Sequence, residues 1–301
     1  MVASSNDKVA LVRNSFEAAH QATLDALTRD LDPTVSLFLL SDHEETAPNA
    51  KPRVFGDGEL IEKAACNFTY SQGAQLPSAA STRNPALTNK PFSASSLSVI
   101  VHPRHPHIPT AHMNVRFFYV DHEHGYWHFG GGMDLTPHIL YEEDAVTWHE
   151  QARAACRSTT EYTLFKQQCD EYFYLPHRQE ARGIGGLFFD DLHMPTFDAC
   201  LQLALNVCEA FRTAYFEIVL RRKGVTPTPT DEKWMLHRRS RYAEFNLIHD
   251  RGTKYGLQSG RRIESVLASL PPRAHWDYAR KPETPAQHAL IACLQHPRAW
   301  L

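Results

Sequence analysis

Two neighbouring stretches, residues 97–102 and 112–120, constrain the fold of this chain more than any other feature. Both are rich in β-branched and aromatic residues and are bounded by proline, glycine or charged turn residues, which is typical of β-strands. Because side chains alternate between the two faces of a strand, the pattern predicts two strands with one apolar and one polar face. The apolar face would carry Leu97, Val99, Val101, Met113, Val115, Phe117 and Tyr119, and the other face Ser98, His102, His112, Asn114, Arg116 and Phe118.

The polar face has two interpretations. An antiparallel sheet often exposes one face to water, so a solvated face is the simpler interpretation. A solvated strand more often carries Lys, Glu and Thr, however, whereas this face carries histidine, asparagine and arginine beside aromatic residues. The choice of side chains therefore favours a binding site.

A third strand is expected over residues 126–129, which run into Gly130, Gly131 and Gly132. Glycines at a strand end let a ligand approach the backbone closely. This would leave Asp134 at the mouth of the site.

The rest of the chain shows helical and strand patterns without a dividing linker. Helices are expected over 6–30, 142–156, 161–175, 196–223, 230–239, a segment ending at 270, and a last segment from Thr284. Short strands are expected at 37–40, 67–70, 187–191, 242–249 and 255–258, and a loop over 71–96. In this interpretation the strand over 242–249 delivers Asp250, Arg251 and Gly252 at its end.

Composition narrows the class of protein. The net charge of −3 argues against bulk nucleic-acid binding. The six cysteines are widely spaced and form no C-x-x-C pair, which favours reduced packing residues in a reducing compartment. No apolar run approaches the ~20 residues of a membrane span, and the N-terminus lacks a secretory pattern. We therefore expect a cytoplasmic protein without a membrane span and without a nucleic-acid partner.

Arginines and carboxylates are the main chemical candidates. Arg116 lies on the polar strand face, and Arg182, Arg251, Arg261 and Arg262 lie beside glycines or at an expected strand end. Arginine forks bind carboxylates bidentately, so this set suits a small substrate with several carboxylates, although ordinary salt bridges explain it equally well. Asp134 and Asp250 are the acid or base candidates, since each lies close to a glycine near an expected strand end.

A metal site is an alternative that the histidines leave open. His102, His112, His149 and His177 are the candidate ligands. The spacing offers little support, because Arg153 stands where an H-E-x-x-H zinc helix needs its second histidine. Residues 182–186 precede a strand and lack the Lys-Ser/Thr of a phosphate loop, so a tight turn is the better interpretation.

Several long ordered motifs resemble one family, the oxygen-dependent coproporphyrinogen III oxidases. They are Ser98-Val-Ile-Val-His-Pro103, His112-Met-Asn-Val-Arg-Phe117, Trp127-His-Phe-Gly-Gly-Gly-Met-Asp-Leu-Thr-Pro137, residues 182–191, Glu244-Phe-Asn-Leu247 and Asp250-Arg-Gly252. The resemblance extends from about Arg53 to the C-terminus, and the N-terminal helix is in the expected place. It departs from the family at residues 65–67 and at residues 260–262, and the departure at 260–262 leaves open whether Arg261 or Arg262 reaches a substrate.

The resemblance implies an α+β fold with a large antiparallel sheet flanked on both faces by helices. Residues 1–301 would form a single catalytic domain, with the N-terminal helix at about 6–30 and the core at about 53–301. The implied assembly is a homodimer. The implied reaction converts two propionates of coproporphyrinogen III, on rings A and B, into vinyl groups in haem biosynthesis. Its products are protoporphyrinogen IX, carbon dioxide and hydrogen peroxide.

The resemblance also assigns roles to residues. His112 would be the proton donor, while Asp250 and Arg251 would hold the pyrrole nitrogens and a propionate. Substrate contacts would come from Ser98, Asn114, Val115, Arg116, Asp134, Arg182, Gly260, Arg261 and Arg262.

The implied chemistry uses dioxygen as co-substrate and no organic cofactor. A divalent metal held by His102, His112, His149 and His177 stays open, as bacterial relatives are linked to one. Two other functions are compatible with the same residues: a non-enzymatic tetrapyrrole carrier, and a metal-dependent oxygenase that uses the histidines.

Overall fold

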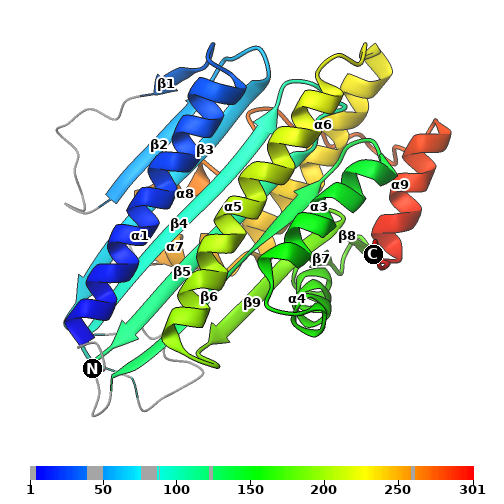
Figure 1. Ribbon diagram of the computed structural model, residues 1–301. Helices are drawn as coiled ribbons and strands as arrows, with labels where there is room; N and C mark the ends of the chain where they lie inside the picture. The colour runs from blue at the N-terminus through cyan, green and yellow to red at the C-terminus, as the bar shows by residue number, and fades with distance from the viewer. Residues whose placement is uncertain (1–4, 39–49, 76–86, 88, 122–124, 259–261) are drawn as a thin grey trace.

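A seven-stranded antiparallel sheet forms the centre of the protein (Figure 1). The computed structural model describes residues 5–38, 50–75, 87, 89–121, 125–258 and 262–301. The strand order is β1-β2-β3-β4-β5-β6-β9. The strands are Ser36–Phe38 (β1), Ala50–Gly56 (β2), Ile61–Gly73 (β3), Phe92–Pro103 (β4), Thr110–Val120 (β5), Tyr126–Thr136 (β6) and Gly185–Leu192 (β9), and a separate short pair joins Tyr174–Leu175 (β7) to Glu180–Ala181 (β8).

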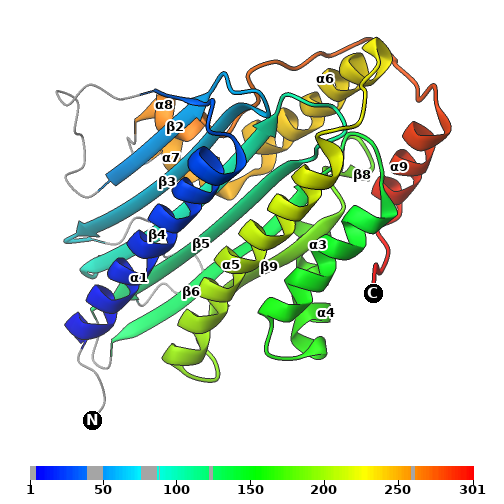
Figure 2. The same cartoon turned by 45° about the horizontal axis from the view of Figure 1, so that its top comes forward.

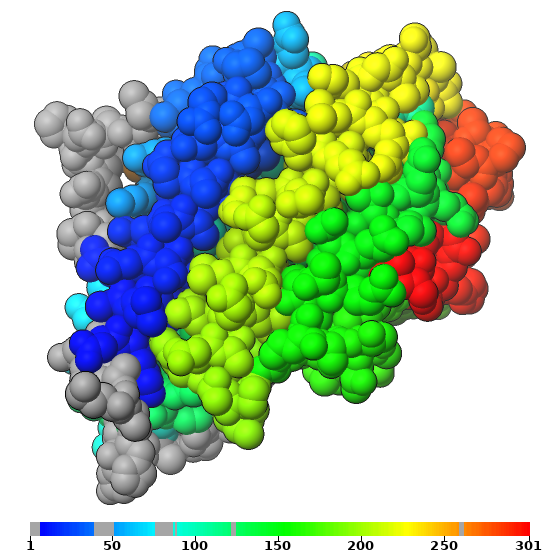
Figure 3. Space-filling model, viewed as in Figure 1, coloured from blue at the N-terminus to red at the C-terminus, as the bar shows by residue number. Residues whose placement is uncertain are grey.

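Helices cover both faces of the sheet. One face carries α1 (Ser5–Asp25), α5 (Phe197–Arg222) and α3 (Glu142–Ala155), which lie side by side in the space-filling view (Figure 3). The other face carries α6 (Pro229–Glu244), α7 (Arg251–Gln258) and α8 (Ile263–Leu267), behind the sheet in Figures 1 and 2. The remaining helices are the π-helical segments Ala26–Leu31 (η1) and Phe245–His249 (η4), with Thr159–Tyr172 (α4) and Pro285–Gln295 (α9). This arrangement confirms the expected α+β fold.

The predicted alternation of the central strands is also confirmed. Leu97 of β4 and Val115 of β5 are fully buried under the helices of the first face. Ser98 and Asn114 lie directly opposite each other and are partly exposed on the second face. Because paired residues of antiparallel strands point to the same side, β4 and β5 present one polar surface. We call it the site face, defined by Ser98, His112, Asn114, Arg116 and Asp134 with Phe188 and Asp190 of β9.

The triple glycine was expected at the end of a strand, but it lies inside β6. Gly130 and Gly132 pair with Arg116 and Asn114 on the site face. A Cβ atom at Gly130 would lie 2.7 Å from the Arg116 Nε atom, and one at Gly132 would lie 1.9 Å from the Leu187 carbonyl oxygen. The glycines therefore let β6 pair closely with β9 and leave room for the Arg116 side chain. Asp134 follows within the strand and is only 1% exposed, so the prediction that it lies at a mouth is wrong.

The strands predicted over 242–249 and 255–258 are helical. Helix α6 continues to Glu244, η4 follows, and α7 begins at Arg251. From Trp234 to Glu244 nearly every residue of α6 is buried, so the sequence lacks the polar stripe that marks an exposed helix. Buried Arg238 and Arg239 are stabilised by Glu180 and Glu62. These partners are distant in sequence, which explains why the local pattern resembled a strand.

The other predicted helices are confirmed with shifted ends. Thr284 caps α9 by accepting a hydrogen bond from the Gln287 N–H, and Thr228, rather than Thr230, caps α6. The loop predicted over 71–96 is shorter, because β3 extends to Gly73 and β4 begins at Phe92. Parts of that loop and of the strand expected at 37–40 lie outside the described residues.

All six cysteines are free thiols. Among the described residues, no helix is both long enough and apolar enough to cross a membrane.

Candidate functional site

An ion pair buried beneath the site face holds one histidine in place. Asp134 of β6 receives hydrogen bonds from Arg182 at 2.8, 3.0 and 3.1 Å. Its Oδ1 atom also lies 2.7 Å from the Nδ1 atom of His112 on β5. The Arg182 side chain is 2% exposed and donates a further hydrogen bond to Asn246 at 2.7 Å. Arg182, Asp134 and His112 therefore form a chain that ends at the site face.

The electrostatics of this chain follow from its burial. Burial raises the pKa of the Asp134 carboxyl, but the Arg182 charge and the His112 hydrogen bond outweigh it and hold that pKa below its usual range. Burial lowers the pKa of Arg182, and the Asp134 charge more than offsets this, so its pKa is raised. Phe173, Tyr242 and Phe245 surround the Arg182 guanidinium, with ring centroids at 4.1, 4.4 and 4.8 Å. Both groups stay charged at neutral pH.

His112 is the end of the chain that can meet a ligand. With Asp134 at Nδ1, the Nε2 atom has no hydrogen-bond partner in the described part of the chain. The side chain is 19% exposed. A carboxylate at one imidazole nitrogen selects the tautomer and orients the other nitrogen. His112 is therefore positioned to exchange a proton at Nε2.

A second ion cluster lies further along the same face. Arg116 donates to Asp190 Oδ1 at 2.7 Å and to Asn114 at 3.2 Å. Arg251, at the start of α7, lies 3.0 Å from the other Asp190 oxygen. Asp190 therefore bridges two arginines from different layers of the fold. Three charges with a net value of +1 remain at this place, which suits an anionic ligand.

Asp250 lies between two helices and not at the end of a strand. One of its oxygens accepts hydrogen bonds from the Thr253 N–H at 2.7 Å and from the Thr253 hydroxyl at 2.9 Å, which caps α7. The other oxygen accepts a hydrogen bond from the Tyr172 hydroxyl at 3.0 Å. The carboxylate is partly buried. One Asp250 oxygen therefore caps α7, and the other is held by Tyr172 of α4.

The other predicted substrate contacts lie in different places. Ser98 and Asn114 are neighbours on the site face. Val115 is fully buried on the opposite face, so only its backbone could reach a ligand from the site face. Arg262 precedes α8 and pairs with Glu264 at 3.3 Å. Gly260 and Arg261 lie outside the described residues.

The four histidines proposed as metal ligands do not fit a metal site as they lie. His102 uses both ring nitrogens, toward Ser269 O at 2.9 Å and the Thr110 hydroxyl at 3.3 Å. His149 uses both, toward the Tyr162 hydroxyl at 2.9 Å and Ile184 O at 3.1 Å. In the part of the chain that the structure describes, no group of three or more His, Cys, Asp or Glu side chains is placed to hold a metal ion.

Burial keeps two of these histidines neutral, and the other two have acidic partners. Burial lowers the pKa of His149 to about 3 and holds that of His102 well below its usual value. His177 binds Glu244 at 2.9 Å, and His112 binds Asp134. Each of the four histidines therefore has hydrogen-bond partners of its own.

Three residues of the site were not among the predicted ones. Asp190 is the first of the two carboxylates that end the expected strand over 187–191, and this pair was the available signal. Asn246 lies within the Glu244-Phe-Asn-Leu247 motif but was assigned to a strand. Tyr172 had no signal in the sequence, because its role depends on contacts with β9 and α7.

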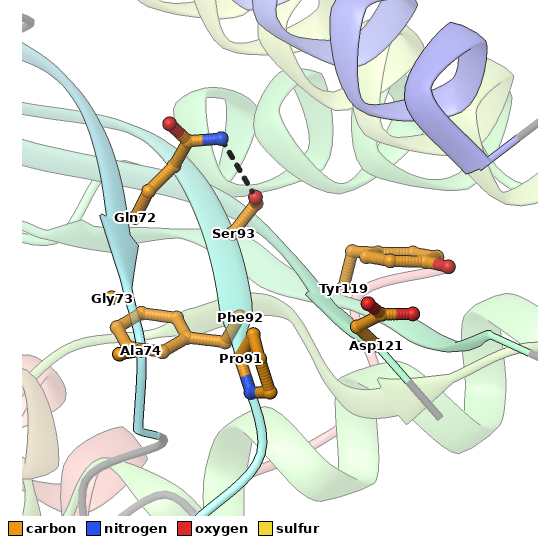
Figure 4. A pocket seen from close by; sticks show the side chains of 8 residues that line it. All are labelled: Gln72, Gly73, Ala74, Pro91, Phe92, Ser93, Tyr119 and Asp121. Atoms are coloured by element: carbon orange, nitrogen blue, oxygen red, sulfur yellow. Dashed lines mark hydrogen bonds between the residues drawn. The ribbon is translucent and has the colours of Figure 1, made fainter. Parts of the chain in front are cut away.

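Within the described part of the chain, a cavity of about 460 Å³ lies away from these residues. It opens at the far end of β3, β4 and β5 (Figure 4). Its lining consists of Gln72, Gly73, Ala74, Pro91, Phe92, Ser93, Tyr119 and Asp121. None of the candidate residues contributes to it.

Glu244 provides a test of the ion pairs at the edge of the site. Burial raises the pKa of this carboxyl, but hydrogen bonds from Arg178 and His177 outweigh it and hold the pKa at about 2. A carboxyl with a depressed pKa contributes stability above its unfolded value of about 4.3, and this contribution is lost as the pH falls through the folded value. We expect the free energy of unfolding to fall more steeply between about pH 4.5 and 2 in the wild type than in Glu244→Gln. Parallel slopes in urea titrations at several pH values would contradict the assignment.

Comparison with known families places the chain in one of them. A sequence model described as coproporphyrinogen III oxidase matches residues 13–300 of the 301-residue chain. The match includes every element of the sheet and all the described residues of the site. The chain therefore belongs to the coproporphyrinogen III oxidase family, oxidoreductases that decarboxylate their substrate oxidatively in haem biosynthesis.

Proposed function

We propose that this protein is an oxygen-dependent coproporphyrinogen III oxidase. It would convert the propionates on rings A and B of coproporphyrinogen III into vinyl groups and release protoporphyrinogen IX. The observation that carries this proposal is the site face, where a tethered histidine shares one sheet surface with Arg116, and Asp190 bridges Arg116 to Arg251 of α7. A tetracarboxylate needs cationic partners, and its proton transfers need a positioned acid or base.

The proposed roles follow the contacts. Arg116 and Arg251 would each bind a propionate. They would use the guanidinium N–H groups that do not contact Asp190. Asp250 would face the pyrrole N–H groups, and His112 would exchange a proton at Nε2. Ser98, Asn114 and Arg262 would provide further polar contacts. Asp134 and Arg182 are buried and would act by holding His112.

Each decarboxylation balances with one dioxygen. The propionate R–CH₂–CH₂–COO⁻ with O₂ and one proton gives R–CH=CH₂, CO₂ and H₂O₂. The carbon next to the ring loses one hydrogen, the C–COO⁻ bond breaks, and the two electrons pass to dioxygen. The electron-rich pyrrole ring would supply electrons once Asp250 has accepted the proton of the pyrrole N–H group. We propose that no organic cofactor takes part, and no step is assigned to a metal because the four histidines do not fit one.

Incubation with coproporphyrinogen III in air and under anaerobic conditions tests this function. The expected result is protoporphyrin after oxidation of the product, with carbon dioxide and hydrogen peroxide formed only in air. Binding without any oxygen uptake would indicate a tetrapyrrole carrier. Activity that disappears on chelation and returns with a divalent metal would indicate a metal-dependent oxygenase.

Arg116→Ala should weaken substrate binding by about 2 kcal/mol, because a substrate carboxylate loses a charged hydrogen-bond partner. The Michaelis constant and the turnover number of the folded variant are the measurements. Lys90→Ala, which removes an exposed cation from the segment that precedes β4, is the control. Wild-type values for both constants in Arg116→Ala would remove this residue from the site.

We also propose a homodimer in the cytoplasm. Leu247, Ile248, Leu257 and Ile263 are each about half exposed, an unusual cluster of apolar side chains on a protein surface. The six free thiols fit a reducing compartment.

Light scattering should give a mass of twice 34.2 kDa at micromolar concentration, with residues 242–270 contributing to the interface. Leu257→Glu should shift the mass toward the monomer, because it places a charge among the apolar side chains. A wild-type monomer would contradict the proposed assembly.

A further inference from the structure

Tyr172 is the one described side chain whose hydroxyl contacts both Asp250 and Arg251. The hydroxyl donates a hydrogen bond to the Asp250 carboxylate at 3.0 Å and accepts one from the Arg251 backbone N–H at 3.2 Å. The Arg251 guanidinium also lies 4.8 Å from the centre of the Tyr172 ring, within the range of a cation–π contact. Tyr172 therefore connects the proposed pyrrole partner to the proposed propionate partner.

The ring of Tyr172 is held on several sides, so its hydroxyl has a defined position. It stacks on Phe188 of β9 with centroids 4.1 Å apart and planes 11° apart. Phe173 and Phe245 contact it edge-on, at 4.8 and 5.6 Å. Phe188 lies on β9 and Phe245 on η4, and Phe173 directly follows the end of α4. The stack fixes the end of α4 against the sheet. Because the Tyr172 hydroxyl bonds Asp250 and the Arg251 N–H, it also fixes the start of α7.

Asp250 depends on Tyr172 for its orientation. Its Oδ2 atom is already committed to the Thr253 cap at 2.7 and 2.9 Å. The cap alone leaves the position of the second oxygen open to rotation of the carboxylate plane. The Tyr172 hydroxyl bonds this second oxygen and thereby sets the direction of its remaining lone pair.

The protonation of Tyr172 is consistent with a donor role. Burial raises the pKa of this phenol, and the Asp250 charge raises it further. The hydroxyl therefore keeps its proton at neutral pH and donates a hydrogen bond to the Asp250 carboxylate.

We propose that Tyr172 is a positioning residue of this enzyme: it aligns Asp250 and Arg251 as one unit for the pyrrole and the propionate of the same substrate ring. The proposal rests on the roles of Asp250 and Arg251 in the proposed function. It predicts that the three residues act together, so that removing one makes the next removal less harmful.

Tyr172→Phe is the direct test, because it removes the hydroxyl and keeps the ring stack. Turnover should fall about tenfold to a hundredfold, the scale of one hydrogen bond to a charged group. The thermal midpoint should stay near that of the wild type. Tyr174→Phe is the matched control, since the Tyr174 hydroxyl has no hydrogen bond among the described residues; its turnover should not change.

A double-mutant cycle separates positioning from a structural effect. Tyr172→Phe should cost about twofold or less when it is added to Asp250→Asn, because the hydroxyl then has no carboxylate to orient. A full, independent loss in the Asp250→Asn background would overturn the proposal, as would wild-type turnover in Tyr172→Phe alone.

The same cycle can be measured without catalysis. Coproporphyrin III, the oxidised macrocycle, serves as the probe, and its affinity is followed by fluorescence. Tyr172→Phe and Asp250→Asn should again be non-additive. Coupled binding with an inactive wild type would count against the proposed reaction alone, whereas additive binding effects together with additive turnover effects would overturn the role of Tyr172.

Discussion

Asp250→Asn is expected to lower turnover by about 10²–10⁴-fold, the range typical of a positioned acid or base. The variant keeps the size of the side chain but removes the negative charge that would face the pyrrole N–H groups. The amide oxygen can still accept the hydrogen bond from the Thr253 N–H. The fold and the thermal midpoint should therefore change little, because asparagine caps helices about as well as aspartate.

Asp250→Ala separates the charge from the cap. It removes both, so it should lose the same turnover and an additional ~0.5–2 kcal/mol of stability. Near-normal turnover in Asp250→Asn would leave the helix cap as the role of this residue. A loss of activity matched by a loss of folded protein in thermal scans would likewise count against a catalytic charge.

Arg182→Met should be the most destabilising single change in the site, by about 3–5 kcal/mol. Arg182 and Asp134 are 2% and 1% exposed, and the variant leaves the Asp134 carboxylate buried without its cation. It also removes the hydrogen bond to Asn246 and the contacts with three aromatic rings. Chemical denaturation gives the free energy of unfolding directly.

The double variant Arg182→Met with Asp134→Asn is the control for this prediction. It removes both charges, so it should be more stable than Arg182→Met alone. If the double variant were less stable by the sum of two independent losses, the buried pair would not be the cause.

The pH dependence of Arg182→Met has a defined sign. In the wild type the pKa of Asp134 lies below its usual value, so the pair stabilises the fold above about pH 4 and the contribution is lost as the pH falls. Without Arg182, burial would raise this pKa above its unfolded value. The deficit of the variant relative to the wild type should then shrink as the pH is lowered, since the folded state takes up the proton.

The polar and apolar faces of β4 and β5 could be predicted from sequence because the period of a strand is two residues. That period depends only on the local backbone, so His112, Asn114 and Arg116 were assigned correctly to one surface. The long motifs around them were sufficient to identify the family.

The segment after Trp234 could not be predicted in the same way. Its arginines are buried in a helix because Glu62 and Glu180 neutralise Arg239 and Arg238. These carboxylates lie on β3 and β8, far away in the sequence. Local propensity depends on neighbouring residues alone and cannot indicate such partners. Aromatic and apolar residues around Tyr242 therefore suggested a strand, and Asp250 was placed at the wrong kind of element.

The connections within the site likewise depend on chain folding over long separations. Asp134 was expected to be open to a ligand, yet the approach of Arg182 from the β8–β9 turn buries it as an ion pair. Asp190 and Tyr172 gain their contacts with Arg251 only when β9, α4 and α7 meet. Strand periodicity thus predicted which side chains share one surface, whereas burial and pairing in three dimensions determined the partners of each side chain.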